Sequence, residues 1–381
     1  MAKLGMPTVV VKFIEAGIEA IKRSQRGIVA LILEDTKQVI DKLATKTNGH
    51  EVLPNPFLVY TVDDIPEELS DKNKDYILKA LNGYNKPPLK IVVYMMQQGG
   101  DKTGADRFQE PLKAMLTERF DYLAIPTIET AQLEYVATWV KTARENKFKK
   151  IKVVLPGSNA DYEGVINFGN TKVVTADREY KAAEYTARIA GLVAGTNMTQ
   201  SATYAPLTEV IDCDRHTQDE MDTMVNEGKF FIWYDGEKFK MSRAMNSLVT
   251  TSQGKLEGYQ TIKIVDIMDM IYDDIRKTAQ DSYIGKYTND YENKCLLIGA
   301  ILGYFKQLEN KRLLQKDYST CEIDCEAVRT YQLSHGLFTK EELAKMSDDE
   351  VKKLDTKKIV FLKAKVRPLD AMEDVQLPIN I

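Results

Sequence analysis

The sequence predicts a mixed α/β fold, in which an α/β layer is followed by a domain of long helices packed on a second sheet. Apolar strand patterns alternate with amphipathic helix patterns over residues 58–156, and this alternation is typical of a parallel or mostly parallel sheet. After residue 260 the pattern changes to two long helices and further strand-like runs. In addition, each end of the chain carries an apolar strand pattern.

The N-terminal strand pattern is the β-branched run at residues 8–14 (TVVVKFI). Alternate residues of a strand share a face, and one face of this run holds Val9, Val11 and Phe13. A polar linker follows at residues 17–26 and begins with Gly17. The next run, residues 27–33 (GIVALIL), is apolar throughout, which predicts a central strand covered on both faces.

The α/β layer continues with alternating helix and strand patterns. The first helix pattern starts near Ser70 and has Asn82-Gly83 as its stop signal. We expect helices near residues 70–81, 105–118 and 129–146, and strands at residues 90–96, 122–125 and 151–155.

No motif of this layer predicts a catalytic or cofactor site. Residues 99–104 (GGDKTG) are glycine-rich, but Lys102 precedes the last glycine and the spacing of a phosphate-binding loop is missing. We interpret this stretch as a turn. The sequence contains no GxGxxG after a strand, no GxSxG and no HExxH. His216 lies close to Cys213, but a structural zinc site needs further ligands at matching spacing, so we predict no metal site.

The second half predicts close helix packing and a hairpin. One face of the helix at residues 178–194 holds only small residues: Ala183, Ala187, Ala190, Gly191 and Ala194. Such a face allows another backbone to approach closely. Residues 229–240 predict a hairpin with a two-residue Asp235-Gly236 turn. A helix follows at residues 264–277, where the adjacent Asp273 and Asp274 point apart. We expect Asn289 to cap the next helix, with Glu292 three residues later.

The C-terminal part predicts strands at residues 323–331 and 359–367, then a break at Pro368 and a turn that includes Asp370. A final alternation places Val375, Leu377, Ile379 and Ile381 on one face. Two interpretations of this last strand remain open. It could lie at the edge of its own sheet, where Pro378 is tolerated, or add to the sheet of a neighbouring copy.

Composition limits the classes of function. With 44% hydrophobic and 28% charged residues, the 381-residue chain is typical of a soluble protein of two or three domains. A net charge of -4 argues against a nucleic-acid binder, although residues 147–152 (KFKKIK) form a local basic patch. We see no signal peptide and no apolar stretch long enough to span a membrane. Four cysteines without framework spacing indicate synthesis in a reducing cytoplasm.

Four stretches resemble the contractile tail sheath proteins of bacteriophages and R-type bacteriocins. The first is the small-residue helix with its following loop, residues 187–204 (ARIAGLVAGTNMTQSATY), and the second is the segment after the hairpin, residues 241–252 (MSRAMNSLVTTS). The third is the long helix with a YIGK turn, residues 261–289 (TIKIVDIMDMIYDDIRKTAQDSYIGKYTN), and the fourth is the C-terminal arm, residues 366–381 (VRPLDAMEDVQLPINI). Residues 35–175 match only in general α/β character. The chain has Arg243-Ala244-Met245 where the family often has Arg-Gly-Ile.

The resemblance implies a polymer in which six subunits form a ring and rings stack helically around a tail tube. A baseplate signal would trigger contraction and drive the tube through a target envelope. The implied partners are further copies of the chain and the tube, baseplate and tail terminator proteins, with no nucleic acid, membrane insertion or cofactor. Terminal strands would complete the sheets of neighbouring subunits, and flexible linkers would lie at Gly17, Pro368 and Asp370. The residues of these strands that would face the neighbour are Val9, Val11, Phe13, Val375, Leu377, Ile379 and Ile381.

We therefore expect an N-terminal arm at residues 1–26, an α/β sheath domain at 27–255 with an outer part at roughly 35–175, a core domain at 256–367 and a C-terminal arm at 368–381. The leading hypothesis is a non-enzymatic sheath subunit made in the bacterial cytoplasm and assembled in a phage tail or bacteriocin particle. Two alternatives remain: an α/β enzyme acting on a nucleotide or small molecule, and a tube or baseplate component that does not contract.

Overall fold

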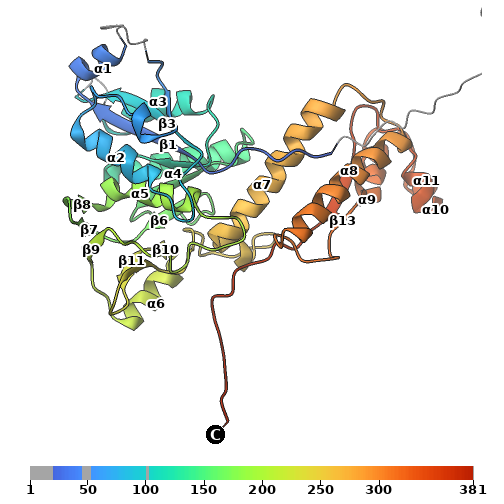
Figure 1. The fold of residues 1–381 in the computed structure, drawn as a ribbon. Helices are drawn as coiled ribbons and strands as arrows, with labels where there is room; N and C mark the ends of the chain where they lie inside the picture. Colours follow the sequence, from blue (N-terminus) through green and yellow to red (C-terminus); the bar gives the residue numbers. More distant parts are fainter. Residues whose placement is uncertain (1–19, 45–52, 100–102, 381) are drawn as a thin grey trace, which may run out of the picture. The chain divides into compact units, whose positions relative to one another are not determined.

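The computed structural model describes residues 20–44, 53–99 and 103–380. The chain forms two compact units, each built from segments that are distant in sequence (Figure 1). The larger unit comprises Arg23–Asp273 and Pro368–Ile381, and the smaller unit comprises Met1–Lys22 and Asp274–Arg367. The predicted N-terminal strand residues Val9, Val11 and Phe13, together with Gly17 and Ile381, lie outside the described residues.

The larger unit contains a seven-stranded sheet with the order β10-β6-β5-β4-β1-β3-β2. All neighbouring pairs are parallel except the edge pair of β2 with β3. Its strands are β1 (Ile28–Asp35), β2 (Phe57–Val59), β3 (Lys90–Gln97), β4 (Tyr122–Ala124), β5 (Lys152–Pro156), β6 (Val165–Phe168) and β10 (Lys229–Phe230). This sheet confirms the predicted α/β layer.

Helices cover both faces of the sheet because its central strand is apolar on both. Val29, Leu31 and Leu33 of β1 share one core with α2 and α5, whereas Ile28, Ala30 and Ile32 share the opposite core with α3 and α4. The α-helices of this unit before residue 200 are α1 (Lys37–Leu43), α2 (Asp71–Leu81), α3 (Gln109–Met115), α4 (Leu133–Glu145) and α5 (Ala182–Ala194). Short 3-10 turns lie at Val62–Asp64, Gly104–Phe108, Thr130–Gln132 and Glu257–Gln260.

The rest of the larger unit contains two small sheets and a helix. One sheet has the order β8-β7-β9, and the other is the β11-β12 hairpin. The elements are β7 (Lys172–Thr175), β8 (Glu179–Lys181), β9 (Val210–Cys213), α6 (Gln218–Asn226), β11 (Ile232–Tyr234) and β12 (Phe239–Met241). The predicted two-residue hairpin turn is wrong. Tyr234 pairs with Phe239, so four residues form the loop, and the Asp235 carboxylate accepts hydrogen bonds from two backbone N–H groups within it.

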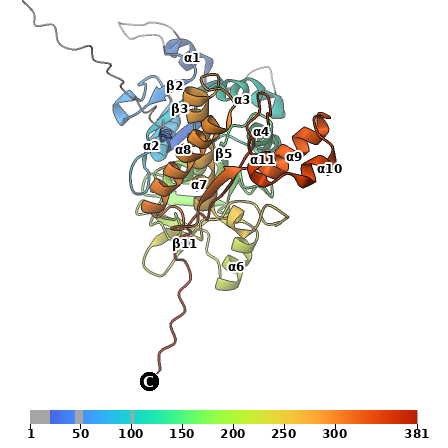
Figure 2. The ribbon, with the colours of Figure 1, turned by 90° about the vertical axis from the view of Figure 1, so that its right-hand side faces the viewer.

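A long helix, α7 (Ile262–Thr278), belongs to the larger unit up to Asp273 and to the smaller unit from Asp274 onward. A π-helical turn, Ala279–Tyr283, follows it. The smaller unit then contains α8 (Tyr291–Asn310), β13 (Thr320–Ile323), α9 (Cys325–Ser334), α10 (Lys340–Lys345), α11 (Asp348–Val351) and β14 (Leu362–Lys365). Helices α9, α10 and α11 group together in this unit (Figure 2).

Two sequence predictions in the smaller unit are wrong. The strand expected at residues 323–331 stops at Ile323, because the Asp324 carboxylate accepts the N–H groups of Glu326 and Ala327 and thereby starts α9. The residue that caps α8 is Asp290 rather than Asn289. Asn289 instead donates hydrogen bonds to the carbonyls of Lys357 and Ile359.

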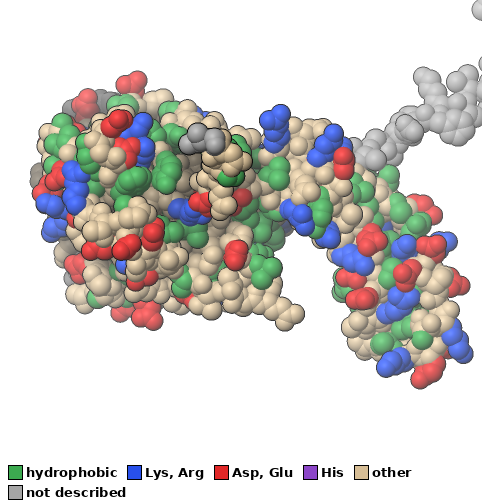
Figure 3. All heavy atoms as spheres, turned by 90° about the horizontal axis from the view of Figure 1, so that it is seen from below, with side chains coloured by type: hydrophobic (Ala, Val, Ile, Leu, Met, Phe, Trp, Pro, Cys, Tyr) green, Lys and Arg blue, Asp and Glu red, His purple; other side chains and the backbone are tan. Residues whose placement is uncertain are grey.

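The C-terminal alternation is present as exposed chain. Residues 375–380 belong to no strand within the described part of the protein. The side chains of Val375, Leu377 and Ile379 are 83%, 74% and 75% exposed. The surface in view in Figure 3 intermixes acidic, basic and hydrophobic side chains.

The small-residue face of α5 packs closely on α2, as the sequence predicts. A Cβ atom on Gly191 would lie 2.1 Å from the carbonyl oxygen of Ala80, whereas a Cβ on Gly303 in α8 would meet nothing within 4 Å. We expect Gly191→Ala to destabilise the protein by about 1–3 kcal/mol through overpacking. Gly303→Ala should stabilise it by about 0.5–1 kcal/mol through helix propensity. Urea unfolding measures both shifts, and an unchanged midpoint for Gly191→Ala would contradict the close packing.

Candidate assembly site

Two places in the larger unit fix where the terminal segments leave it. We call residues 23–26 the N-terminal root and residues 368–374 the C-terminal root. Both consist of residues that belong to this unit. Each is held by side chains from distant parts of the chain, so each is a candidate site for controlling assembly.

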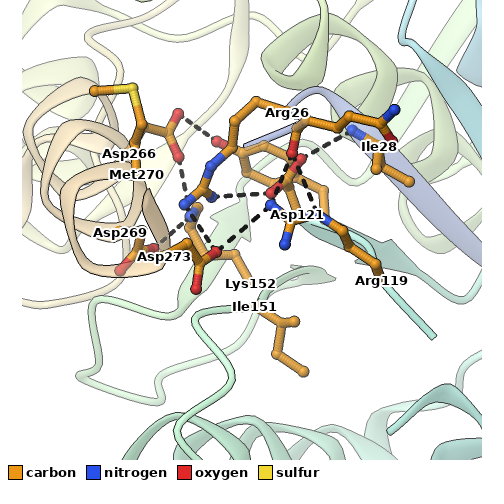
Figure 4. Close-up of polar contacts among 12 residues, drawn as sticks. Arg26, Ile28, Arg119, Asp121, Ile151, Lys152, Asp266, Asp269, Met270 and Asp273 are labelled. Atoms are coloured by element: carbon orange, nitrogen blue, oxygen red, sulfur yellow. Dashed lines mark hydrogen bonds and ion pairs between the residues drawn. The ribbon is translucent and has the colours of Figure 1, made fainter. Parts of the chain in front are cut away.

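Arg26 holds the N-terminal root through two ion pairs (Figure 4). Its guanidinium lies 2.9 Å from the Asp121 carboxylate and 3.0 Å from that of Asp273. Asp121 also accepts the backbone N–H of Ile28 at 3.0 Å. Arg119 donates to the carbonyl of Gln25 at 2.8 Å. The root is therefore fixed to the start of β1, to the residue before β4 and to α7.

A second group of charges joins the same helix to β5 and α4. The Lys152 ammonium, on a side chain only 1% exposed, lies 2.9 Å from Asp266 and 2.6 Å from Asp269. Arg144 donates two hydrogen bonds of 2.9 Å to the two oxygens of Asp269. Burial lowers the pKa of Lys152, but the charges of Asp266 and Asp269 outweigh it, and the pKa is raised overall. Lys152 is therefore charged.

Helical spacing explains why α7 supplies these carboxylates. Asp266, Asp269 and Asp273 are three and four residues apart, so they share one face of the helix. That face meets the amino ends of parallel strands, because Asp121 directly precedes β4 and Lys152 begins β5. Together with Arg26, Arg119, Arg144 and Asp121, the cluster holds four cations and four carboxylates. Buried charges are tolerated when they are paired in this way.

Part of this charge cluster could be seen in the sequence. The prediction that Asp273 and Asp274 point apart is confirmed. Asp273 pairs with Arg26 in the larger unit, and Asp274 accepts a 2.6 Å hydrogen bond from the Tyr304 hydroxyl in the smaller unit. The cationic partners, Arg26, Arg144 and Lys152, do not stand out in the sequence. A row of aspartates spaced three and four residues apart along one helix was the signal that could have pointed to them.

Glu373 holds the C-terminal root. Its carboxylate accepts hydrogen bonds from the Ser201 hydroxyl at 3.0 Å and the Thr203 hydroxyl at 2.6 Å. The Arg243 guanidinium lies 3.6 Å from Glu373 and is also bonded to Asp374. The bond to Asp374 is the largest influence on the pKa of Arg243, which is raised. Residues 375–380 therefore follow directly after an anchored pair of residues.

Three of the stretches singled out in the sequence meet at this root. Ser201 and Thr203 come from residues 187–204, Arg243 from residues 241–252, and Glu373 from residues 366–381. From the sequence, Pro368 and Asp370 were expected here as linker residues, and Arg243 was noted only beside a departure from the family, whereas Glu373 was not singled out. Ala244, where the family often has glycine, is not among the described residues with positive φ. A side chain is therefore tolerated there.

The other sequence candidates are the glycine-rich stretch at residues 99–104 and the neighbouring Cys213 and His216. Residues 100–102 of the glycine-rich stretch lie outside the described part of the chain. Burial raises the pKa of the Cys213 thiol to about 11. Among the described residues, no group of three or more His, Cys, Asp or Glu side chains is arranged to hold a metal ion. Within the same residues, no helix is long and apolar enough to cross a membrane.

Comparison with known families and sequences gives a consistent result. The profile described as "Phage tail sheath protein central domain" matches residues 101–247, and "Phage tail sheath C-terminal domain" matches residues 255–381. The tail sheath protein of Clostridium phage phiCD119 is 32% identical over 382 residues, which cover 99% of each chain. The XkdK protein of the phage-like element PBSX from Bacillus subtilis is 29% identical, over 47% of this chain and 40% of its own length.

Solved structures share the fold at low identity. The helical sheath of the anti-feeding prophage in its contracted state has a TM-score of 0.67 at 12% identity, with 99% of both chains covered. The sheath tail protein of Desulfitobacterium hafniense has a TM-score of 0.67 at 18% identity, covering 83% of this chain and 94% of that one. At these identities the comparison shows the fold alone.

The buried Asp269 carboxylate of α7 should make the free energy of unfolding depend on pH. Burial would raise the pKa of Asp269, but the charges of Lys152 and Arg144 outweigh it and lower the pKa from 3.8 to about 2. The resulting stabilisation is present above pH 4 and is lost as the pH falls from about 4 to 2. Asp269→Asn should cost about 3–5 kcal/mol in the free energy of unfolding at pH 7 and weaken this acid dependence.

The control is Asp41→Asn, which removes an exposed partner of Lys37 and should change stability by less than about 1 kcal/mol. Urea unfolding between pH 2 and pH 7 measures both variants. If Asp269→Asn and Asp41→Asn behave alike, the buried charges do not secure α7.

Proposed function

Because this chain belongs to the phage tail sheath protein family, we propose that it is a structural subunit of a contractile tail sheath. Its copies would form six-membered rings that stack helically around a tail tube, in contact with baseplate and tail terminator proteins. Contraction would drive the tube through a target envelope. The chain would be made in the bacterial cytoplasm and assembled in a virion tail or bacteriocin particle. The proposal assigns no catalytic residue and no cofactor, in keeping with relatives that are sheath proteins.

The observation that carries the proposal is the two-stranded sheet of the smaller unit. β13 and β14 pair antiparallel, with Cys321 opposite Ala364 and Ile323 opposite Leu362. Within the described residues each strand of this pair has one edge with no strand neighbour, and the unpaired N–H and C=O groups of such an edge can pair with another chain. This sheet therefore has a physical reason to accept further strands.

The two faces of this sheet differ in polarity. Helix α8 packs on β13, and Cys321 and Ile323 are buried there, whereas Leu362 is half-buried and Ala364 is exposed. The opposite face holds the ion pair of Glu322 with Lys363. The apolar layer under β14 is therefore only partly covered within the smaller unit.

The C-terminal arm has the matching alternation. Val375, Leu377 and Ile379 form an apolar row, and Gln376, Pro378 and Asn380 form the other row. A strand added beside the β13-β14 pair could continue both faces, with the apolar row on the α8 side. We propose that this strand comes from a neighbouring subunit, as do Ile381 and the N-terminal residues Val9, Val11 and Phe13. We likewise propose that the N-terminal arm ends at residue 26, the α/β sheath domain at residue 255 and the core domain at residue 367.

The roots limit which parts of the arms can move. Glu373 and Asp374 are bonded to the larger unit, so the free C-terminal arm would begin at Val375. Flexibility that involves Pro368 and Asp370 would lie between this anchor and the end of the smaller unit at Arg367. At the other end, Arg26 is anchored, which would place the flexible N-terminal linker, including Gly17, before it. Rigid units joined through short free arms suit a packing that switches between two states.

The apolar row supplies the test. Replacing Val375, Leu377 and Ile379 by serine, or deleting residues 375–381, should leave soluble monomers, because the added strand loses its buried face. Replacing Gln376 and Asn380 by serine is the matched control and should preserve assembly. Sedimentation and electron microscopy of the purified proteins measure the outcome.

Long tubes formed by the truncated protein would contradict the proposed linkage. Imaging of whole particles before and after a trigger separates contraction from a static tube, since one diameter in every condition would exclude contraction.

A further inference from the structure

A basic loop between α4 and β5 exposes an aromatic side chain. Phe148 is 59% exposed and has a positive φ of 54°, a conformation that is unusual for a bulky residue. Lys147, Lys149 and Lys150 surround it in the sequence. Lys147 is exposed, whereas the Lys149 ammonium donates hydrogen bonds to the carbonyls of Leu116 and Glu118. We call residues 147–150 the basic knob. The knob is held at its base, where the backbone N–H of Lys149 donates to the carbonyl of Ala143 and the Lys150 ammonium lies 4.8 Å from the Tyr272 ring centroid.

A groove elsewhere on the larger unit has the opposite charge. It has a volume of about 1000 Å³, and its mostly polar lining also contains aromatic and methionine side chains, which include Tyr204, Trp233, Met221 and Met245. Its lining also includes one arginine, Arg243, and five carboxylates: Asp222, Glu257, Asp370, Glu373 and Asp374. We call it the acidic groove. Aromatic and methionine side chains suit the docking of an apolar anchor.

The knob and the groove lie at different points along α7. The knob contacts Tyr272, whereas the groove is lined by Gln260 and Thr261 just before the helix begins. Eleven residues separate Thr261 from Tyr272, which corresponds to roughly 16 Å along a helix. Two complementary patches at separate places on one body favour a head-to-tail contact between copies, and such contacts build rings or helical filaments.

We propose that the basic knob of one subunit docks in the acidic groove of a second copy of this chain, with Phe148 among the aromatic side chains and Lys147 against the carboxylates. This inference rests on the proposed function, since it requires a polymer. It adds a contact between the larger units to the linkage through the arms. The groove contains Glu373 and Asp374, so the contact would bear directly on the residues that anchor the C-terminal arm.

Disulfide trapping tests this contact. The double variant Phe148→Cys with Val249→Cys places one thiol on the knob and one on an exposed residue of the groove lining. Both changes are made in a Cys295→Ser parent, because Cys295 is exposed and the other three cysteines are buried. Mild oxidation of assembled rods should give a ladder of covalent trimers and larger species from the double variant. Each single variant should give none.

Charge reversal gives an independent readout. Lys147→Glu should lower the fraction of protein in rods at least threefold at low salt, and adding Asp222→Lys should restore at least half of the loss. Lys42→Glu, which reverses an exposed charge on α1, is the control and should change nothing.

The outcomes separate the two proposals. Failure of the Cys295→Ser parent to form rods would contradict the proposed function and this inference with it. Rods from that parent without a ladder from the double variant, or with covalent dimers alone, would contradict the knob-and-groove contact and leave the sheath function standing.

Discussion

The buried ion pairs between α7 and the amino ends of β4 and β5 are the constraint on which the larger unit depends. Burying Asp269 and Lys152 is expensive unless each charge is compensated, and the geometry compensates both. Because the carboxylates lie on one face of a single helix, they fix its rotation as well as its position. The helix then carries Asp274 into the smaller unit.

The same kind of side-chain bonding determines which residues near the chain ends are anchored to the larger unit. Arg26 ties the first residues of the larger unit into the same charge cluster, and Glu373 ties the last anchored residues to Ser201 and Thr203. The apolar row that begins at Val375 is left exposed, and within the described residues both strands of the β13-β14 pair have an edge with no strand neighbour. An exposed apolar segment and open sheet edges on the same chain support the proposal that the arm of one subunit adds to the sheet of another. In the proposed assembly, the backbone hydrogen bonds of added strands would tolerate changes in the tilt of the subunits.

Much of the larger unit could be predicted because its strands are long apolar runs. β1, β3 and β5 stand out in the sequence, since both of their faces are covered. The run from Ile323 to Tyr331 was misassigned because its apolar residues are few and one capping carboxylate, that of Asp324, decides between strand and helix. Local patterns decide secondary structure only where they are long.

The anchoring residues could not be predicted for a different reason. Arg144 and Asp269 are 125 positions apart, and Thr203 and Glu373 are 170 positions apart. Nothing in either local pattern shows that these partners meet. The family resemblance brought attention to three stretches that do meet at the C-terminal root, but it did not identify the bonds. Tertiary contacts of this kind follow from the fold and not from the periodicity of a segment.

Amide hydrogen exchange tests the central claim, which is that anchored roots carry free strands that become ordered only between subunits. In the unassembled protein, the amides of residues 375–380 should exchange freely, whereas the amide of Ile28, which is bonded to Asp121, should be protected. In assembled rods, residues 375–380 should gain about 100-fold protection while Ile28 changes little. Protection of residues 375–380 in the unassembled chain, or free exchange there in rods, would contradict the account.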